Sequence, residues 1–135
     1  MVDPVLETAV RDHWSEFAGV AVFSRMLDRR FVLRPYQLPP AEAIARSVLE
    51  GDGQQFAVMF SRQSGKDELL AQTVAYLLAR YQQTGGSIVL AAPSFHPQAA
   101  LMRDRLCDRL RQWPVGPEVE LKQGYIVQYG RANAR

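Results

Sequence analysis

The N-terminal third of the chain has apolar residues at helical spacing, interrupted by proline and glycine. Asp3-Pro4 marks the start of a helix over residues 3–17, and a second helical piece is expected from Phe17 to Arg30. Pro39-Pro40 can begin a helix but cannot lie inside one, so residues 41–50 predict a separate helix. We therefore expect this third of the chain to be helical.

Two short, mostly apolar runs follow, at residues 54–60 and 87–92. Each has the character of a strand that is buried on both faces of a parallel sheet. The segment between them, residues 67–83, carries an apolar stripe at helical spacing, as does the segment from Pro97 to Trp113. Strand, helix, strand and helix in alternation predict an α/β fold with a right-handed connection between the two strands.

The end of the chain has a weaker pattern. Residues 119–123 and 125–129 read as two short strands around Gly124, which predicts a hairpin. Residues 131–135 carry no structural signal.

Composition and charge narrow the class only slightly. With 135 residues, 47% of them apolar, the chain can form one domain with a core. The formal net charge of +2 gives no strong sign of nucleic-acid binding, but arginines gather at residues 25–34 and 103–111. The second group alternates with Asp104 and Asp108, so a solvated helix face and a DNA contact both stay open for it. Cys107 is the single cysteine, which excludes an internal disulfide and a cysteine zinc site. No run reaches membrane-spanning length and no signal peptide is recognisable, so we expect a cytoplasmic setting.

The stretch Ser61-Arg62-Gln63-Ser64-Gly65-Lys66-Asp67 lies between the first expected strand and the helix after it. Such a strand, a tight Gly-Lys loop and a helix hold nucleotide phosphates, because backbone N–H groups and the helix dipole face the anion. Lys66 is expected to neutralise the β- and γ-phosphates, and Gly65 to let the backbone approach them. The usual pattern has a glycine at the place of Phe60 and a hydroxyl at the place of Asp67.

Other side chains nearby have two interpretations each. Arg62 could reach the γ-phosphate from within the chain or lie at a loop tip as a surface arginine. Asp67 could hold Mg²⁺, directly or through water, or complement the helix dipole as a first-turn acid. Upstream, Gln37 could pair with an adenine edge beside a stacked Tyr36, or be an ordinary polar loop residue.

Together, Arg34-Pro35-Tyr36-Gln37, the loop Ser61–Asp67 and the segment Val89–Ala99 resemble the ATPase domain of the large terminase subunit of tailed phages. The resemblance covers residues 31–113 and rests on a Q-motif, a deviant Walker A with an early arginine, and a helicase-like motif Ia. It implies binding of ATP and Mg²⁺, with Arg62 and Lys66 as catalytic residues at the phosphates and Asp67 at the metal. The nucleotide-binding residues implied are Arg34, Tyr36, Gln37, Ser61, Arg62, Gln63, Ser64, Gly65, Lys66 and Asp67.

The same resemblance implies a division of the chain. Residues 1–30 would form an N-terminal helical region, and residues 31–135 part of a three-layer P-loop NTPase domain of the RecA or helicase type. The family's next strand ends in Asp-Glu, which holds Mg²⁺ and orients the attacking water, and it has no counterpart here, nor has the nuclease domain. We therefore expect a fragment truncated before the Walker B strand, with little ATP hydrolysis of its own.

In the intact family, ATP hydrolysis drives double-stranded DNA into an empty capsid in the cytoplasm of the bacterial host. The portal and the small terminase subunit would be partners, no membrane would be involved, and the oligomeric state stays open. Ser94–Gln98 would couple the nucleotide site to DNA, with His96 in a structural role. Two alternatives remain: a fragment of a superfamily-2 helicase-like ATPase, and a non-catalytic prophage remnant or nucleotide-binding module.

Overall fold

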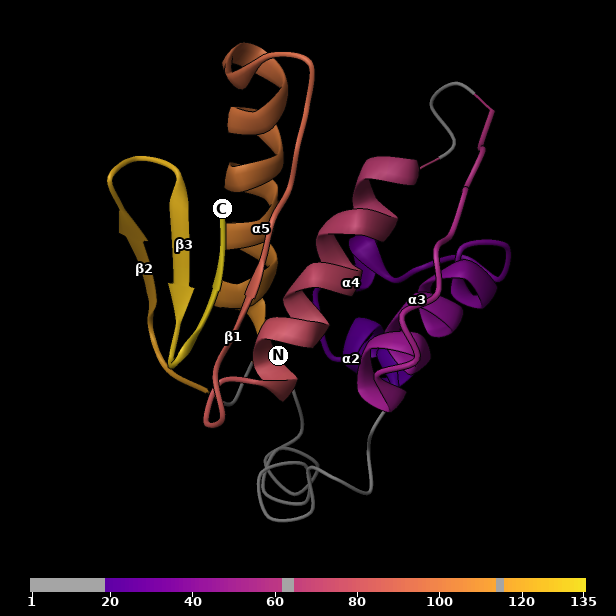
Figure 1. The fold of residues 1–135 in the computed structure, drawn as a ribbon. Helices are drawn as coiled ribbons and strands as arrows, with labels where there is room; N and C mark the ends of the chain where they lie inside the picture. The colour runs from indigo at the N-terminus through magenta and orange to yellow at the C-terminus, as the bar shows by residue number, and fades with distance from the viewer. Residues whose placement is uncertain (1–18, 62–64, 114–115) are drawn as a thin grey trace.

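The structure is a computed structural model that describes residues 19–61, 65–113 and 116–135. Within these ranges it is a mixed α/β fold with a four-stranded sheet in the order β1-β4-β3-β2. Figure 1 shows α4 at the centre, with α2 and α3 on one side and α5 and the sheet on the other. The elements are α2 (Val20–Arg25), η2 (Arg29–Phe31), α3 (Leu38–Glu50), α4 (Lys66–Arg80), β1 (Gly86–Ile88), η3 (Phe95–Ala99), α5 (Ala100–Gln112), β2 (Val119–Lys122), β3 (Ile126–Tyr129) and β4 (Ala132–Ala134).

The helices follow the sequence pattern in part where the structure describes them. Helix α2 begins directly after Gly19, but it ends at Arg25 and does not reach Arg30 as expected, because the Asp28 carboxylate accepts from Arg30 N and starts the separate turn η2. Helix α3 has Pro39-Pro40 in its first turn, where proline removes no hydrogen bond. Helix α3 ends at Gly51, whose φ of 67° lies in the left-handed region that favours glycine. The helix expected over residues 3–17 lies outside the described residues.

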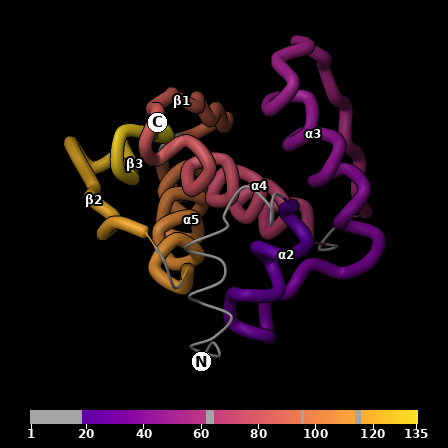
Figure 2. The backbone as a smooth tube through the Cα atoms, turned by 90° about the horizontal axis from the view of Figure 1, so that it is seen from below, coloured from indigo at the N-terminus to yellow at the C-terminus, as the bar shows by residue number. Residues whose placement is uncertain are grey.

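Helix α4 is confirmed, but its buried surface extends well beyond the apolar stripe expected from the sequence. Every residue from Ala71 to Ala79 is buried. Ala71, Ala75 and Ala79 fall one turn apart on the same face, and their small side chains let a neighbouring element approach closely. The cause is its central position, because α2 and α3 pack against it together with α5 and β4 (Figure 2).

The first expected strand, at residues 54–60, is wrong. This segment leaves α3 as an extended chain without a strand ladder, and most of its residues are exposed (Figure 1). Its apolar composition satisfies one requirement of a buried strand, but no described segment pairs with its backbone. The right-handed connection expected between two parallel strands therefore has no first strand to start from.

The second expected strand is only partly confirmed. Strand β1 covers Gly86–Ile88 rather than residues 87–92, and it is largely exposed because it lies at the edge of the sheet. Its one partner is β4, in a parallel ladder, and the pairing continues as Leu90 N donates to Arg135 O at 2.7 Å.

Strand β4 comes from the segment 131–135, in which the sequence gives no structural signal. Alanine is depleted in strands, so Ala132-Asn133-Ala134 gives no local signal. The strand forms because β1 and β3 pair with it on its two sides. Ala132 and Ala134 are each 1% exposed, which shows that tertiary packing selects their conformation.

The expected hairpin is confirmed. Strands β2 and β3 pair antiparallel, from Val119 opposite Tyr129 to Lys122 opposite Ile126. Gln123 and Gly124 both have positive φ, 54° and 76°, as type I′ turns require. The hairpin therefore places its turn beside α5, where Arg103 Nη1 donates to Gly124 O at 2.6 Å.

Candidate nucleotide-binding site

The first residues of α4 meet the segment that precedes α3. Gln37 Nε2 donates to the carbonyl oxygen of Gly65 at 2.8 Å, across 28 residues of sequence. The Oε1 of the same amide accepts from Arg34 N at 2.7 Å, and the residue is 4% exposed. A single buried amide thus ties the expected Q-motif to the expected phosphate loop.

Gly65 is required at this junction for two reasons. Its φ of 90° lies in the left-handed region, which other residues rarely adopt. A Cβ at this position would also collide with Nε2 of Gln37 and come within 3.8 Å of the Tyr36 hydroxyl. From the sequence, we expected a glycine here because it lets the backbone approach a phosphate. In the structure, the group that comes close to Gly65 is the Gln37 side chain.

Tyr36 lies next to this junction, and its side chain is 46% exposed. Its ring packs edge-on against Phe60, with centroids 5.7 Å apart. Arg34 and Ser61 are exposed near the same junction, while Arg62, Gln63 and Ser64 lie outside the described residues. The Tyr36 ring therefore leaves about half of its surface open to solvent near the start of α4.

The Gln37 amide is already engaged with the backbone. An amide has two N–H groups and two oxygen lone pairs, so one of each remains after these two hydrogen bonds. Pairing with an adenine edge would have to use those remaining groups or break the backbone bonds. The observed role of Gln37 is to fix the two segments against each other.

Lys66 and Asp67 are the first two residues of α4, and both side chains are exposed. They line a cavity of about 1090 Å³ together with His96 and Gln98 of the expected motif Ia and with Arg103 and Arg105 of α5. This volume lies just above the range of about 300–1,000 Å³ that is typical of small-molecule sites. The structure thus brings Lys66, Asp67 and the segment around His96 to one cavity.

The charged side chains that line this cavity favour binding of an anion. Lys66 and the two arginines of α5 outnumber the carboxylate of Asp67 among the residues named above. The residue that precedes the first turn of α4, Gly65, has no side chain that could accept from the N–H groups there. Lys66 is the first residue of α4, so its positive charge adds to that of the N-terminal end of the helix dipole.

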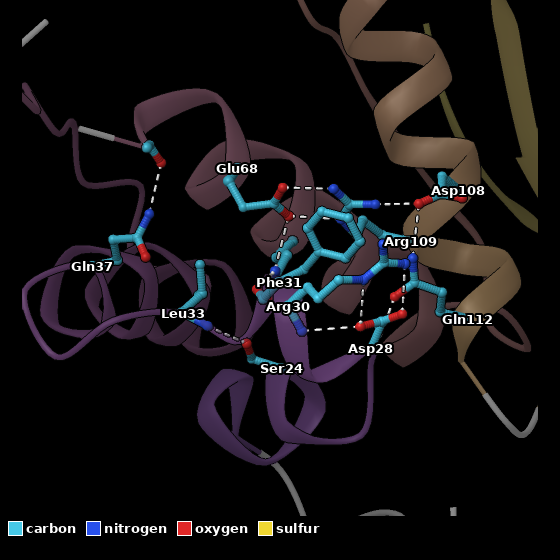
Figure 3. Close-up of polar contacts among 12 residues, drawn as sticks. Ser24, Asp28, Arg30, Phe31, Leu33, Gln37, Glu68, Asp108, Arg109 and Gln112 are labelled. Carbon is cyan, nitrogen blue, oxygen red and sulfur yellow. Dashed lines mark hydrogen bonds and ion pairs between the residues drawn. The ribbon is translucent and has the colours of Figure 1, made fainter. Parts of the chain in front are cut away.

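Glu68, one residue further along α4, turns to a different partner. Arg109 of α5 donates to its carboxylate twice, from Nε at 2.8 Å and from Nη2 at 2.7 Å. Gln72 Nε2 donates to the same carboxylate at 2.9 Å and also bonds the Phe31 carbonyl oxygen. The Arg109 guanidinium lies over the Phe31 ring, 3.5 Å from its centroid (Figure 3).

The electrostatics of this pair follow from its burial and geometry. Burial by itself raises the pKa of Glu68, but the hydrogen bonds from Arg109 and Gln72 outweigh it, so the pKa lies below its ordinary value. Burial likewise opposes the charge of Arg109, and the hydrogen bonds that Arg109 donates to Glu68, with the negative charge of that carboxylate, reverse the effect and raise the pKa of Arg109. The carboxylate and the guanidinium are therefore both charged when the protein is folded.

Arg109 corrects one interpretation of the sequence. The arginines at residues 103–111 were expected on a solvated face or at DNA, yet Arg109 is 5% exposed and engaged with Glu68. The sequence signal was available, because Arg109 falls next to Leu110 and three residues after Leu106, both of which are buried. Glu68 was missed because it lies beside the more conspicuous Lys66 and Asp67.

For the expected metal, the described residues offer Asp67 alone. They contain no cluster of three or more His, Cys, Asp or Glu side chains that could hold an ion. Nucleotide-bound Mg²⁺ commonly takes only one or two protein carboxylates, with phosphates and waters as its other ligands. One exposed carboxylate beside Lys66 fits that kind of site and does not fit a metal centre built from protein ligands only.

In the same described ranges, no helix has the length and apolar composition needed to cross a membrane. Comparison with protein-family models, with curated proteins and with solved structures gives no match in any of the three. The functional argument therefore rests on the chain's own residues and their geometry.

Proposed function

We propose that the start of α4 binds the phosphates of ATP together with Mg²⁺, as part of a P-loop ATPase domain of the terminase type. In the intact protein this site would power the translocation of double-stranded DNA. The observation that carries the proposal is the hydrogen bond from Gln37 to Gly65, since it joins two segments that the sequence had assigned to one nucleotide.

Lys66, Asp67 and Tyr36 each have a role in this proposal. The Lys66 ammonium attracts the β- and γ-phosphates at the cavity mouth, and the first N–H groups of α4 face the same anion. Asp67 would hold the Mg²⁺ ion, directly or through a water molecule. Bound Mg²⁺ would neutralise phosphate charge, and the half-exposed Tyr36 ring would offer a stacking face to the base.

The direct test is nucleotide binding by the Lys66→Ala variant, measured by calorimetry with ATP and Mg²⁺. A charge-assisted hydrogen bond is worth about 1.5–3 kcal/mol, so we expect binding to weaken roughly tenfold to a hundredfold. Lys122→Ala is the matched control, because Lys122 is an exposed lysine on β2 and the only other lysine of the chain. If Lys66→Ala and Lys122→Ala bind ATP with equal affinity, or if the unaltered chain does not bind ATP, the proposal is wrong.

A further inference from the structure

The sheet has two edge strands, β1 and β2, and only β2 carries charged side chains that discourage pairing with a further strand. Strand β2 carries Glu120 and Lys122, both exposed, and charges on an edge strand discourage addition of another strand. Strand β1 and the residues after it, Gly86–Ala92, have no charged side chain, and Val89 is 74% exposed. In the part of the chain that the structure describes, nothing pairs with the outer edge of β1.

A second cavity lies beside this edge. It has a volume of about 270 Å³ and is lined by β1 itself and by Val48, Leu77, Leu78 and Tyr81. An apolar cavity of roughly 150 Å³ is enough to hold a benzene ring. The cavity next to β1 therefore has room for one large apolar side chain brought in by an added strand.

Within the described part of the chain, residues 54–60 have the properties of a strand that could pair with this edge. The segment is extended, uncharged and without a strand partner, and it is of the same length as Gly86–Ala92. Met59 is 92% exposed and Phe56 is 40% exposed, so two side chains suited to the cavity point away from the core. Helix α4 lies between this segment and the sheet of its own chain (Figures 1 and 2).

We propose that two copies of the chain associate by strand addition, with residues 54–60 of one copy pairing along the outer edge of β1 in the other. Met59, the more exposed of the two side chains, enters the cavity beside β1, and the absence of charge on both segments lets their side chains pack without burying an unpaired ion. When residues 54–60 of each copy pair with β1 of the other, all four unpaired segments gain a partner and the two copies form a closed two-fold dimer. This inference does not depend on nucleotide binding.

The test begins with the mass of the chain in solution, measured by light scattering during size exclusion over a range of concentrations. We expect a dimer, and we expect Met59→Lys and Val89→Lys each to weaken it about a hundredfold, because each places a charge in the apolar interface. Leu121→Lys is the matched control on the charged edge, where Leu121 is 48% exposed, and it should leave the dimer intact. Lys66→Ala should also leave it intact, which separates this proposal from the nucleotide site.

A mixing experiment identifies the pairing itself. The Met59→Lys copy keeps an intact β1 edge, and the Val89→Lys copy keeps an intact 54–60 segment. Mixed together, they should form a complex at concentrations at which each variant alone, weakened about a hundredfold, stays monomeric. A monomeric parent chain, a dimer that survives both substitutions, equal loss in Leu121→Lys, or no complex on mixing would each overturn the proposal.

Discussion

Replacing Arg109 by methionine should destabilise the fold far more than the same change at another arginine of α5. The substitution keeps most of the side-chain volume but leaves the Glu68 carboxylate, which is 17% exposed, without its two charged hydrogen bonds. Removing one partner of a buried ion pair costs about 3–5 kcal/mol. Because Glu68 keeps some access to water and its bond from Gln72, we expect the lower end, about 3 kcal/mol.

The measurement is the free energy of unfolding in urea, which is well defined for a single domain that unfolds in one step. Arg111→Met is the control, because Arg111 is exposed on the same helix and its loss should change the free energy by no more than about 0.5 kcal/mol. A cost for Arg109→Met that equals the cost for Arg111→Met would refute the reasoning.

A double variant separates the ion pair from simple packing. In Glu68→Met with Arg109→Met, no uncompensated charge remains, and replacement of a whole buried pair by apolar groups is often close to neutral. We therefore expect the double variant to be more stable than Arg109→Met alone. If it is less stable by the sum of the two single losses, the two side chains act independently and the pair has no coupling to measure.

Three further predictions follow from the same contacts. Glu68 has a folded pKa below its ordinary value of about 4.3, so its contribution to stability should be complete above that pH and be lost as the pH falls through the lower folded pKa. The free energies of unfolding of Glu68→Gln and of the parent, measured in urea, should therefore converge at acid pH. Gly65→Ala should lower the free energy of unfolding by about 2 kcal/mol through its left-handed backbone and the collision with Gln37, whereas Gly19→Ala, whose methyl meets nothing within 4 Å, should not. Asp67→Asn should weaken ATP binding when Mg²⁺ is present and strengthen it when Mg²⁺ is chelated; equal effects under both conditions, measured by calorimetry, would assign Asp67 to the helix dipole instead.

The sequence predicts α3 and α4 well because their signals are local. Pro39-Pro40 and Gly51 restrict the backbone directly, so the start and the end of α3 follow from these residues. The hairpin is predicted for the same reason, since Gly124 and its neighbours suit a turn with positive φ. Such signals need no knowledge of what lies elsewhere in the fold.

The strands show where local patterns stop being informative. Residues 54–60 have the composition of a buried strand and lack a partner, while Ala132–Ala134 have a poor composition and gain two partners. A strand exists only when another backbone accepts its hydrogen bonds, and that pairing is not encoded in the segment itself. Arg109 illustrates the same limit for side chains, because its neighbour Glu68 is 41 residues away in sequence.

The site is predictable in its parts but not in how the parts are held. Gln37, Gly65 and Lys66 were identified from motif spacing, yet the bond that joins the first two is a structural fact. The start of α4 is fixed on one side by Gln37 and on another by Arg109 through Glu68, while Lys66 and Asp67 remain directed to the cavity. Ordering this first helical turn before a ligand arrives removes part of the entropy cost of binding. On this reasoning, Arg109→Met should weaken nucleotide binding as well as the fold, although Arg109 lies outside the residues that line the cavity.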